Sequence, residues 1–148
     1  MVTIRALRAE DKDQWQRLYD VYQGFYGRPD LPQGFFDSGF ARLMSGDRRD
    51  FQGLVAADGG QLLGLTHYVF HPTMRTPAGT CYLQDLFTVP EARGKGVGRA
   101  LIEAVCDAAR SRGALEVYWL TAEDNYPGRM LYDRVASRTP FIKYGRAP

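Results

Sequence analysis

The sequence is poor in the residues on which disulfide-bonded and metal-dependent proteins depend. Its 148 residues include only two cysteines, Cys81 and Cys106, and two histidines, His67 and His71. The cysteines lie in apolar surroundings and outside any CxxC or Cys/His cluster, so we expect two reduced, buried thiols. The histidines fall in a strand-like run, where a separation of four residues places them about 13 Å apart. We therefore predict no metal site, and we interpret His67 as a strand residue and His71 as a turn residue, with a role in the cleft as the lesser alternative.

Neither an excess of one charge nor a long hydrophobic run is present. Nineteen Lys and Arg residues stand against 17 Asp and Glu, a net charge of +2, which argues against the broad basic surface of a nucleic-acid-binding protein. The amino-terminal stretch MVTIRALRAED has no apolar run of signal-peptide length, and no segment approaches the length of a membrane span. We expect a cytoplasmic protein with no nucleic-acid or membrane partner, in which any electropositive site is local.

The composition suits one folded domain. Hydrophobic residues make up 45% and aromatic residues 13% of the chain, which is too much for a disordered protein. A length of 148 residues is enough for one sizeable core and short for two. Because the chain has no internal repeat, low-complexity tract or linker, we predict a single domain over residues 1–148.

Hydrophobic periodicity gives the expected order of helices and strands. A strand over 2–7 precedes a helix that ends near Gly24 or Gly27, and a second short helix surrounds Phe36 and Phe40. The remaining expected elements are strands in FQGLVAAD (51–58), QLLGLTHYVFH (61–71) and TCYLQDLFTV (80–89) with a turn at 72–79, a helix from Gly96 to a cap at Gly113, a strand in ALEVYWLT (114–121), a helix from 125 to 135 and a closing strand in FIKYG (141–145). This order predicts a mixed α/β fold with an antiparallel meander, and it disfavours a doubly wound nucleotide fold.

The most informative stretch is VPEARGKGVGRALIEAV (89–105), in which glycines at every second position stand among cationic side chains before a helical pattern. A glycine-rich turn between a strand and a helix binds phosphate well, because free N–H groups converge there and the helix dipole favours an anion. Larger side chains in place of the glycines would hold a phosphate further away, and the cations suit a pyrophosphate. The residues concerned are Gly94, Gly96, Gly98, Arg93, Lys95 and Arg99.

Two known phosphate-binding loops do not fit this turn. A Walker A loop needs Gly-Lys followed by Ser or Thr, whereas Lys95 is followed by Gly96. The dinucleotide fingerprint needs glycine at the first, third and sixth positions, and the sixth position counted from Gly94 is Arg99. A tight strand-to-helix turn with a solvated basic face is the alternative that the loop alone leaves open.

A third pattern does fit, because RGKGVG (93–98) matches the Arg/Gln-x-x-Gly-x-Gly/Ala signature of the GNAT superfamily of acyl-CoA-dependent N-acetyltransferases. The chain resembles this family along its length, including CYLQDLFTV, VYWLT, DNYPGRMLYDRVA and the terminal FIKY, and it is most similar to the polyamine- and histone-acetylating branch. The resemblance implies a largely antiparallel central sheet flanked by helices, acetyl-CoA as cosubstrate, no metal, and the homodimers that are common in the family.

The resemblance also implies a coenzyme A site. The N–H groups of residues 94–99 would hold the pyrophosphate, and the backbone of residues 86–88 would pair with the pantetheine arm like an added strand. Asn125 matches the asparagine that contacts the pantetheine, and Tyr132 matches the tyrosine near the thioester sulfur. The cofactor-binding residues implied in this way are Leu86, Phe87, Thr88, Arg93, Gly94, Lys95, Gly96, Val97, Gly98, Arg99 and Asn125.

Acetyl transfer to an amine needs a base more than a nucleophile. An unprotonated amine attacks a thioester directly once the two are aligned, but an alkyl amine with a pKa of about 10.4 is almost fully protonated at pH 7. Asp85 is the candidate base, on the strand face opposite Gln84 and Leu86; its alternative role is to pair with a cationic side chain. The polyamine branch has a glutamate linked to proton removal where this chain has Gln84, so Asp85 or water takes the proton, or the substrate differs.

The candidate acid is Tyr132, because a phenol with a pKa of about 10 can protonate a departing thiolate; packing in the core is its alternative role. The acceptor site is expected on the first two helices, where aromatic residues and aspartates suit a cationic amine, although they suit a core as well. Our leading hypothesis is acetylation of a primary amine, either a polyamine-like molecule or a lysine side chain. Alternatives are another small amine, such as an amino acid or aminoglycoside, and a non-catalytic acyl-CoA-binding regulatory module. The expected acceptor contacts are Tyr22, Tyr26, Gln84 and Trp119.

Overall fold

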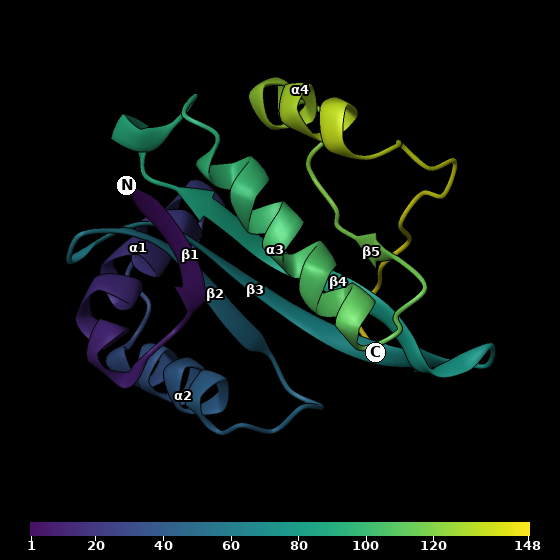
Figure 1. Ribbon diagram of the computed structural model, residues 1–148, viewed down its shortest axis with the longest axis horizontal. Helices are drawn as coiled ribbons and strands as arrows, with labels where there is room; N and C mark the ends of the chain where they lie inside the picture. The colour runs from purple at the N-terminus through teal and green to yellow at the C-terminus, as the bar shows by residue number, and fades with distance from the viewer.

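Five strands form one sheet in the order β1-β2-β3-β4-β5, seen here in a computed structural model that describes residues 1–148 (Figure 1). The strands are β1 (Val2–Ala6), β2 (Gln52–Asp58), β3 (Gln61–Thr73), β4 (Thr76–Thr88) and β5 (Val117–Tyr118). Neighbouring strands pair antiparallel, except that β4 and β5 pair parallel. The predicted α/β fold with a largely antiparallel sheet is therefore confirmed.

Helices cover both faces of the sheet (Figure 1). α1 (Lys12–Phe25) and α2 (Gln33–Met44) lie on one face, and α3 (Val97–Ser111) and α4 (Tyr126–Val135) lie on the other. On the first face Trp15 and Phe36 pack against Leu65 in one buried cluster, and on the second Ile102 packs with Leu83 in another. α1, α2 and α3 each bury apolar residues against the sheet, as their periodicity predicts, whereas α4 packs with partly buried side chains only. No helix combines the length and hydrophobicity needed to cross a membrane.

A β-bulge in β4 changes which residues face which layer. Tyr68 pairs with Leu83 and its neighbour His67 pairs with Asp85, so Gln84 is an extra residue in β4. Before the bulge, Leu83 packs on the α3 side of the sheet; after it, Asp85 contacts His67 on the α1 side. Asp85 and Leu86 therefore face opposite sides of the sheet, as the alternation of a strand predicts. The bulged Gln84 does not follow this alternation and is exposed.

β5 covers only a small part of the outer edge of β4. Cys81 and Tyr82 pair with Val117 and Tyr118, and residues 83–88 have β3 on one side and no strand on the other. The predicted strand over 114–121 was thus too long, because the chain turns away after Tyr118 to reach α4. The result is a sheet that is open along the second half of β4.

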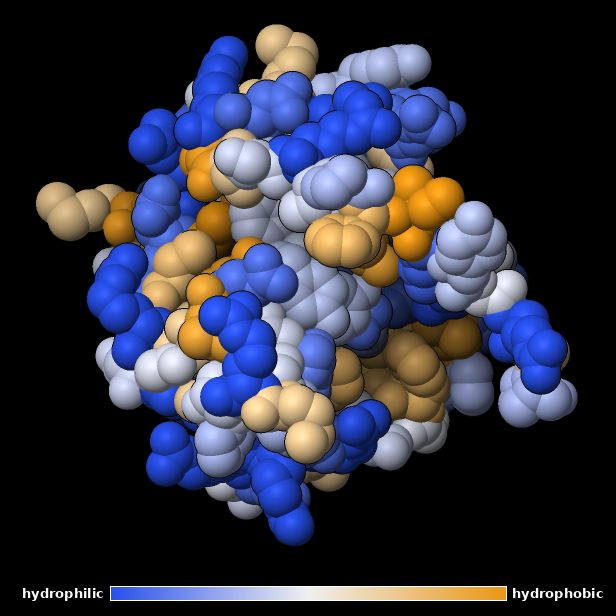
Figure 2. Space-filling model, turned by 90° about the vertical axis from the view of Figure 1, so that its right-hand side faces the viewer, coloured by the Kyte–Doolittle hydropathy of each residue, from blue (hydrophilic) through white to orange (hydrophobic).

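Two other sequence predictions were wrong. The expected closing strand at 141–145 is absent: residues 136–148 form neither helix nor strand, and the Phe141 and Tyr144 side chains are exposed. A strand forms only against a partner edge, and the free edge of β5 is two residues long. Figure 2 shows the right-hand side of the view in Figure 1, where hydrophobic patches alternate with hydrophilic residues instead of forming one apolar face.

The expected turn over 72–79 is almost entirely strand, because β3 and β4 continue until only residues 74–75 remain between them. His71 is consequently a strand residue and not a turn residue. Gly79 has a φ of +63°, and a β-carbon there would clash with the His71 carbonyl oxygen, so this long hairpin depends on a glycine.

The two thiols are free, Cys81 fully buried and Cys106 only partly buried. Burial raises the pKa of the Cys81 thiol to about 12 and raises that of Cys106 as well. Neither is a thiolate at neutral pH, so neither is an activated nucleophile. No group of three or more His, Cys, Asp or Glu side chains is arranged to hold a metal ion.

Candidate active site

The turn between β4 and α3 presents a run of unbonded backbone N–H groups. Gly94 and Gly96 adopt positive φ angles of +75° and +83°, and α3 begins at Val97. The N–H groups of residues 94–99 donate to no acceptor in the chain; the Ala100 N–H is the first to bond, to the Gly96 carbonyl at 3.0 Å. A helix always begins with free N–H groups, and the glycine turn extends the set to six. This donor set fits a diphosphate.

The cationic side chains of the turn differ in their surroundings. Arg93 Nε donates to the Thr88 carbonyl at 3.1 Å, and its guanidinium lies 5.7 Å from the ring centre of Phe25. Lys95 and Arg99 are exposed and form no salt bridge. Arg93 therefore holds the turn against β4 and α1, while Lys95 and Arg99 are the cations left free to meet an anion.

Asp85 ends a chain of buried hydrogen bonds. Its Oδ2 lies 2.8 Å from Nδ1 of His67 and 3.3 Å from the Tyr19 hydroxyl, which donates to it. On the other side of the imidazole, Nε2 of His67 accepts from the Trp15 indole N–H at 2.9 Å. Asp85 is 7% exposed, His67 4% and Trp15 1%. No Lys or Arg pairs with Asp85, so the carboxyl group is not part of a structural ion pair with a permanent cation.

Phenol groups extend from Asp85 towards α4. Burial, and then the Asp85 charge, raises the pKa of Tyr19 and of Tyr22 well above the usual value near 10. The Tyr22 and Tyr26 ring centres are 5.0 Å apart. Burial, and then the nearby Tyr26, raises the pKa of Tyr132. Tyr19 and Tyr22 therefore lie near the candidate base, and Tyr26, next to Tyr22, is close enough to the candidate acid to affect its pKa.

Trp119 contacts the candidate acid, and Gln84 is the neighbour of the candidate base in β4. The Trp119 ring meets the Tyr132 ring edge to face, with centres 5.4 Å apart, and Gln84 is the exposed bulge residue next to Asp85. The four expected acceptor contacts thus come from α1 and the residue that follows it, from β4 and from the segment after β5. Tyr26 is 55% exposed, so the phenol groups reach solvent at the end of α1.

Asn125 is engaged in the structure of α4 itself. Its side-chain oxygen accepts from the Gly128 N–H at 3.3 Å, which caps the helix, and its amide donates to the Thr121 hydroxyl at 2.9 Å. A β-carbon at Gly128 would lie 2.5 Å from the Asn125 amide nitrogen. The side chain therefore fixes the start of the helix that carries Tyr132, and its contact with pantetheine remains a prediction.

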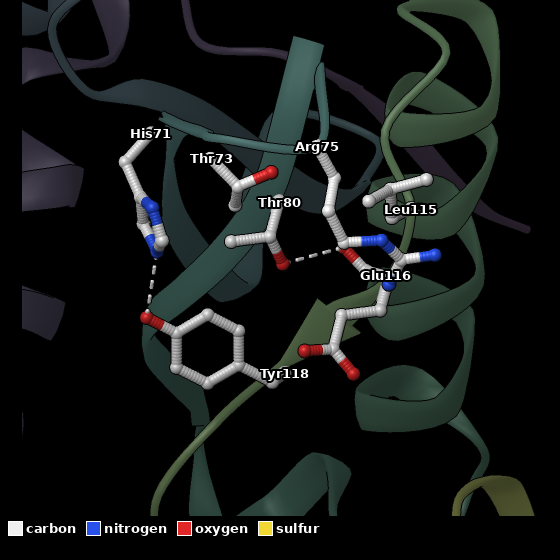
Figure 3. Close-up of a pocket in the computed structure, with 7 residues that line it drawn as sticks. All are labelled: His71, Thr73, Arg75, Thr80, Leu115, Glu116 and Tyr118. Atoms are coloured by element: carbon white, nitrogen blue, oxygen red, sulfur yellow. Dashed lines mark hydrogen bonds between the residues drawn. The ribbon is translucent and has the colours of Figure 1, made fainter. Parts of the chain in front are cut away.

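A separate groove of about 430 Å³ lies at the far end of the sheet (Figure 3). In it the Tyr118 hydroxyl lies 3.1 Å from Nε2 of His71, and Thr80 donates to the Glu116 carbonyl at 3.2 Å. The groove borders the segment that follows the carboxyl end of α3, and the 15 residues of that helix span about 22 Å. It is therefore remote from the glycine turn.

Free backbone amides beside an open sheet edge form an arrangement that suits a phosphate-bearing ligand whose arm adds to the sheet as a further strand. Residues 15–136 match the acetyltransferase (GNAT) family. The chain belongs to this family and is an N-acetyltransferase.

Two relatives in sequence support this membership. The chain is 33% identical over 147 residues to the D-amino-acid N-acetyltransferase HPA3 of Saccharomyces cerevisiae, covering 98% of this chain and 90% of the yeast protein. It is 30% identical, also over 147 residues, to the uncharacterized N-acetyltransferase YhfO of Bacillus subtilis, covering 97% of this chain and 95% of the relative.

Solved structures share the fold. A ribosomal-protein-alanine N-acetyltransferase from Brucella melitensis biovar Abortus superposes with a TM-score of 0.82 at 24% identity, covering 99% of both chains. The aminoglycoside N-acetyltransferase AAC(6')-Iy, in complex with a bisubstrate analogue, superposes with a TM-score of 0.85 at 18% identity, covering 100% of this chain and 99% of the other.

Sequence reasoning missed the residues behind Asp85. Trp15 looked like one more member of an apolar helix stripe, and His67 like an ordinary strand residue. A signal was available in principle, because His67 and Asp85 are facing residues of adjacent strands. The bulge at Gln84 sets that register, and bulge positions are not readable from alternation alone.

Proposed function

We propose that this N-acetyltransferase moves acetyl from acetyl-CoA to a primary amine of a small molecule, with Asp85 as the base and Tyr132 as the acid. The observation that supports this assignment is that Asp85 lies on the open half of β4 and bonds to the Tyr19 phenol, while Tyr132 is a buried phenol on α4 whose pKa responds to Tyr26 at the end of α1. A buried carboxyl and a protonated phenol in one site suit the removal of one proton and the donation of another.

Coenzyme A would be held by the backbone more than by side chains. The N–H groups of residues 94–99 would take the pyrophosphate, with Lys95 and Arg99 adding charge. The open edge at Leu86, Phe87 and Thr88 would pair with the pantetheine, and one of these N–H groups would stabilise the negative charge on the thioester oxygen. The bound coenzyme supplies the activated acetyl group.

The protons balance as follows. Asp85 accepts one proton from the substrate ammonium and leaves a neutral amine, whose nitrogen attacks the carbonyl carbon. As the C–N bond forms and the C–S bond breaks, Tyr132 donates its proton to the sulfur and then takes one from the nitrogen. Asp85 finally releases its proton to solvent. The products are an amide, the free thiol of coenzyme A and one proton.

An amino acid is the acceptor that we favour. The yeast relative of 33% identity is named for D-amino acids, and a fitting side chain is present here. Arg28 has no carboxylate partner, its backbone and side chain bond to Gln23, and its charge acts on the Tyr19 phenol beside Asp85. A carboxyl group near Arg28 and an amino group near Asp85 would suit an amino acid.

The second candidate acceptor is a polyamine or a lysine side chain. Stacked aromatic rings favour it, because Tyr19 lies parallel to Phe35 at 6.0 Å and next to the Asp85 carboxyl, an arrangement that suits an alkyl ammonium without a carboxylate. This acceptor would make no use of Arg28.

One assay tests the function and separates the acceptors. Purified protein is incubated with acetyl-CoA and D- or L-amino acids, spermidine, an aminoglycoside or a lysine peptide, with thiol release and product mass as readouts. We expect turnover with amino acids, and loss of about a hundredfold in kcat for Asp85→Asn. Coenzyme binding without any acetylated product would favour the regulatory module, and full activity of Asp85→Asn would remove Asp85 from the role of base.

We further propose that the chain forms a homodimer through its carboxyl-terminal segment. Phe141, Ile142 and Tyr144 are 75–88% exposed, and β5 has a free outer edge. The apolar side chains would be covered if the segment crossed to a second copy. Light scattering should give a dimer for the whole chain and a monomer for a variant that ends at residue 139; a monomeric whole chain would contradict the proposal.

A further inference from the structure

Two buried residues behind the candidate base restrict the states that it can adopt. A Trp indole N–H can only donate, so the 2.9 Å contact from Trp15 requires Nε2 of His67 to be an acceptor. The imidazole can then carry its proton only on Nδ1, 2.8 Å from Oδ2 of Asp85. The imidazole therefore donates to the carboxyl group, and a second proton on the ring would break the bond to Trp15.

The geometry points to a positioning role for Trp15 and His67, which we propose hold Asp85 as an oriented, acceptor-only carboxylate that is ready to take the proton of the substrate ammonium. This inference rests on the proposed role of Asp85 as base. His67 donates from the core, and Tyr19 donates to the same Oδ2 from α1. Both of these bonds end on Oδ2, and the Tyr22 phenol also interacts with the carboxyl group; we assign Oδ1 as the oxygen for the incoming nitrogen.

The side chains around Trp15, His67 and Asp85 include no other group that would give a proton to the imidazole or to the carboxyl group. The titratable and charged groups that face it are the phenols of Tyr19 and Tyr22 on α1, the Tyr82 phenol on β4 and the Arg28 guanidinium beyond α1. The pKa of each of these phenols is raised, in each case first by burial and then by the Asp85 charge. They stay protonated at neutral pH, so the tautomer of His67 follows from its own two partners, the Trp15 donor at Nε2 and the Asp85 acceptor at Nδ1.

Removing the indole N–H should make the site sensitive to pH. In Trp15→Phe, Nε2 of His67 is free to take a proton, and the resulting imidazolium would weaken Asp85 as a base by pairing with it. We expect kcat to fall by about tenfold or more, with a new loss of activity as pH decreases and the ring takes up a second proton. If Trp15 had only a structural role, its replacement would lower the folded fraction but would add no loss of activity at low pH, which we call the acid limb of the pH profile.

Two variants of His67 sharpen the test. In His67→Asn, the amide nitrogen takes the place of Nδ1 and can still donate to Asp85, so we expect activity close to that of the parent and no new acid limb. In His67→Leu the donor is lost, and kcat should fall between about tenfold and a hundredfold. Phe40→Leu is the matched control for packing, because its ring lies 5.2 Å from Trp15 but takes no part in the hydrogen bonds.

A spectroscopic measurement reports on the tautomer without activity. The chain has two histidines, so His71→Gln leaves one imidazole, and its ¹⁵N shifts should show the Nδ1-protonated form unchanged between pH 6 and 8. Trp15→Phe should convert it to a titrating imidazole. A titrating His67 in the parent, or an unchanged pH profile in both Trp15→Phe and His67→Leu, overturns the inference. If Asp85→Asn alone retains full turnover, the proposed base fails instead.

Discussion

Gly94 and Gly96 lie two residues apart in the turn before α3, and both have left-handed backbone conformations, with φ of +75° and +83°. A β-carbon on either would meet no atom within 4 Å. Backbone conformation, and not lack of space, therefore requires glycine at these positions. The space above the turn is consistent with a ligand that approaches the backbone closely.

This relationship predicts the effect of charge at Gly96. Asn and Asp are nearly equal in size and both tolerate positive φ better than most residues, so Gly96→Asn should cost coenzyme A only part of its affinity. Gly96→Asp places a negative charge beside the diphosphate and should abolish binding. Isothermal titration with coenzyme A measures the difference. Equal affinities of the two variants would mean that the phosphates bind elsewhere.

Tyr132→Phe should lower kcat by about tenfold to a hundredfold with little change in the dissociation constant of coenzyme A. The reason is that the hydroxyl is needed when the sulfur departs, and the ring packing on α3 is retained. Because burial raises the pKa of Tyr132, the parent should keep this acid protonated up to and beyond pH 10. Tyr126→Phe on the same helix, at 66% exposure, is the control and should behave as the parent.

Arg28→Gln should separate the two candidate acceptors. If the guanidinium binds a substrate carboxylate, its loss should raise KM for amino acids by at least about tenfold, while KM for spermidine stays the same. The KM of Arg28→Lys for amino acids should lie between the values of the parent and of Arg28→Gln, because lysine keeps the charge and lacks the planar guanidinium fork. Steady-state kinetics with both substrates gives the answer, and parallel changes for the two would contradict carboxylate recognition by Arg28.

The sequence predicts local features of the fold well and features that depend on strand pairing poorly. The periodicity of α3 and the glycines before it specified the helix start to within one residue, because both are local signals. The strand predicted at 141–145 failed because a strand needs a partner edge, and pairing is not local. Likewise Asp85 could be named from its motif, whereas its hydrogen bonds to His67 and through it to Trp15 depend on a bulge and on a contact between residues 52 positions apart.

An ion pair near the amino terminus, in which Asp11 is buried and Arg5 partly buried, gives a prediction for stability. The Arg5 guanidinium forms two hydrogen bonds with the Asp11 carboxylate, at 2.7 and 2.9 Å, and Asp11 also accepts from the Arg8 N–H at 2.8 Å. The bond from Arg5 is the main cause that lowers the pKa of Asp11, and burial opposes it. These contacts fasten β1 to the start of α1, the helix that carries Trp15, Tyr19 and Tyr22.

Because the pKa of Asp11 is lower in the folded state than in the unfolded state, its contribution to the free energy of unfolding is fully present above the unfolded value of about 3.9 and is lost as pH falls through the folded value. Asp11→Asn should therefore destabilise the protein by about 3 kcal/mol at pH 7, and by progressively less below pH 4. Asp58→Asn is the control, because Asp58 pairs with the amino terminus at 50% exposure and such pairs contribute at most about 1 kcal/mol. Urea unfolding of the three proteins between pH 3 and 7 measures both effects, and a destabilisation by Asp11→Asn that does not change with pH would show that the ion pair is not its cause.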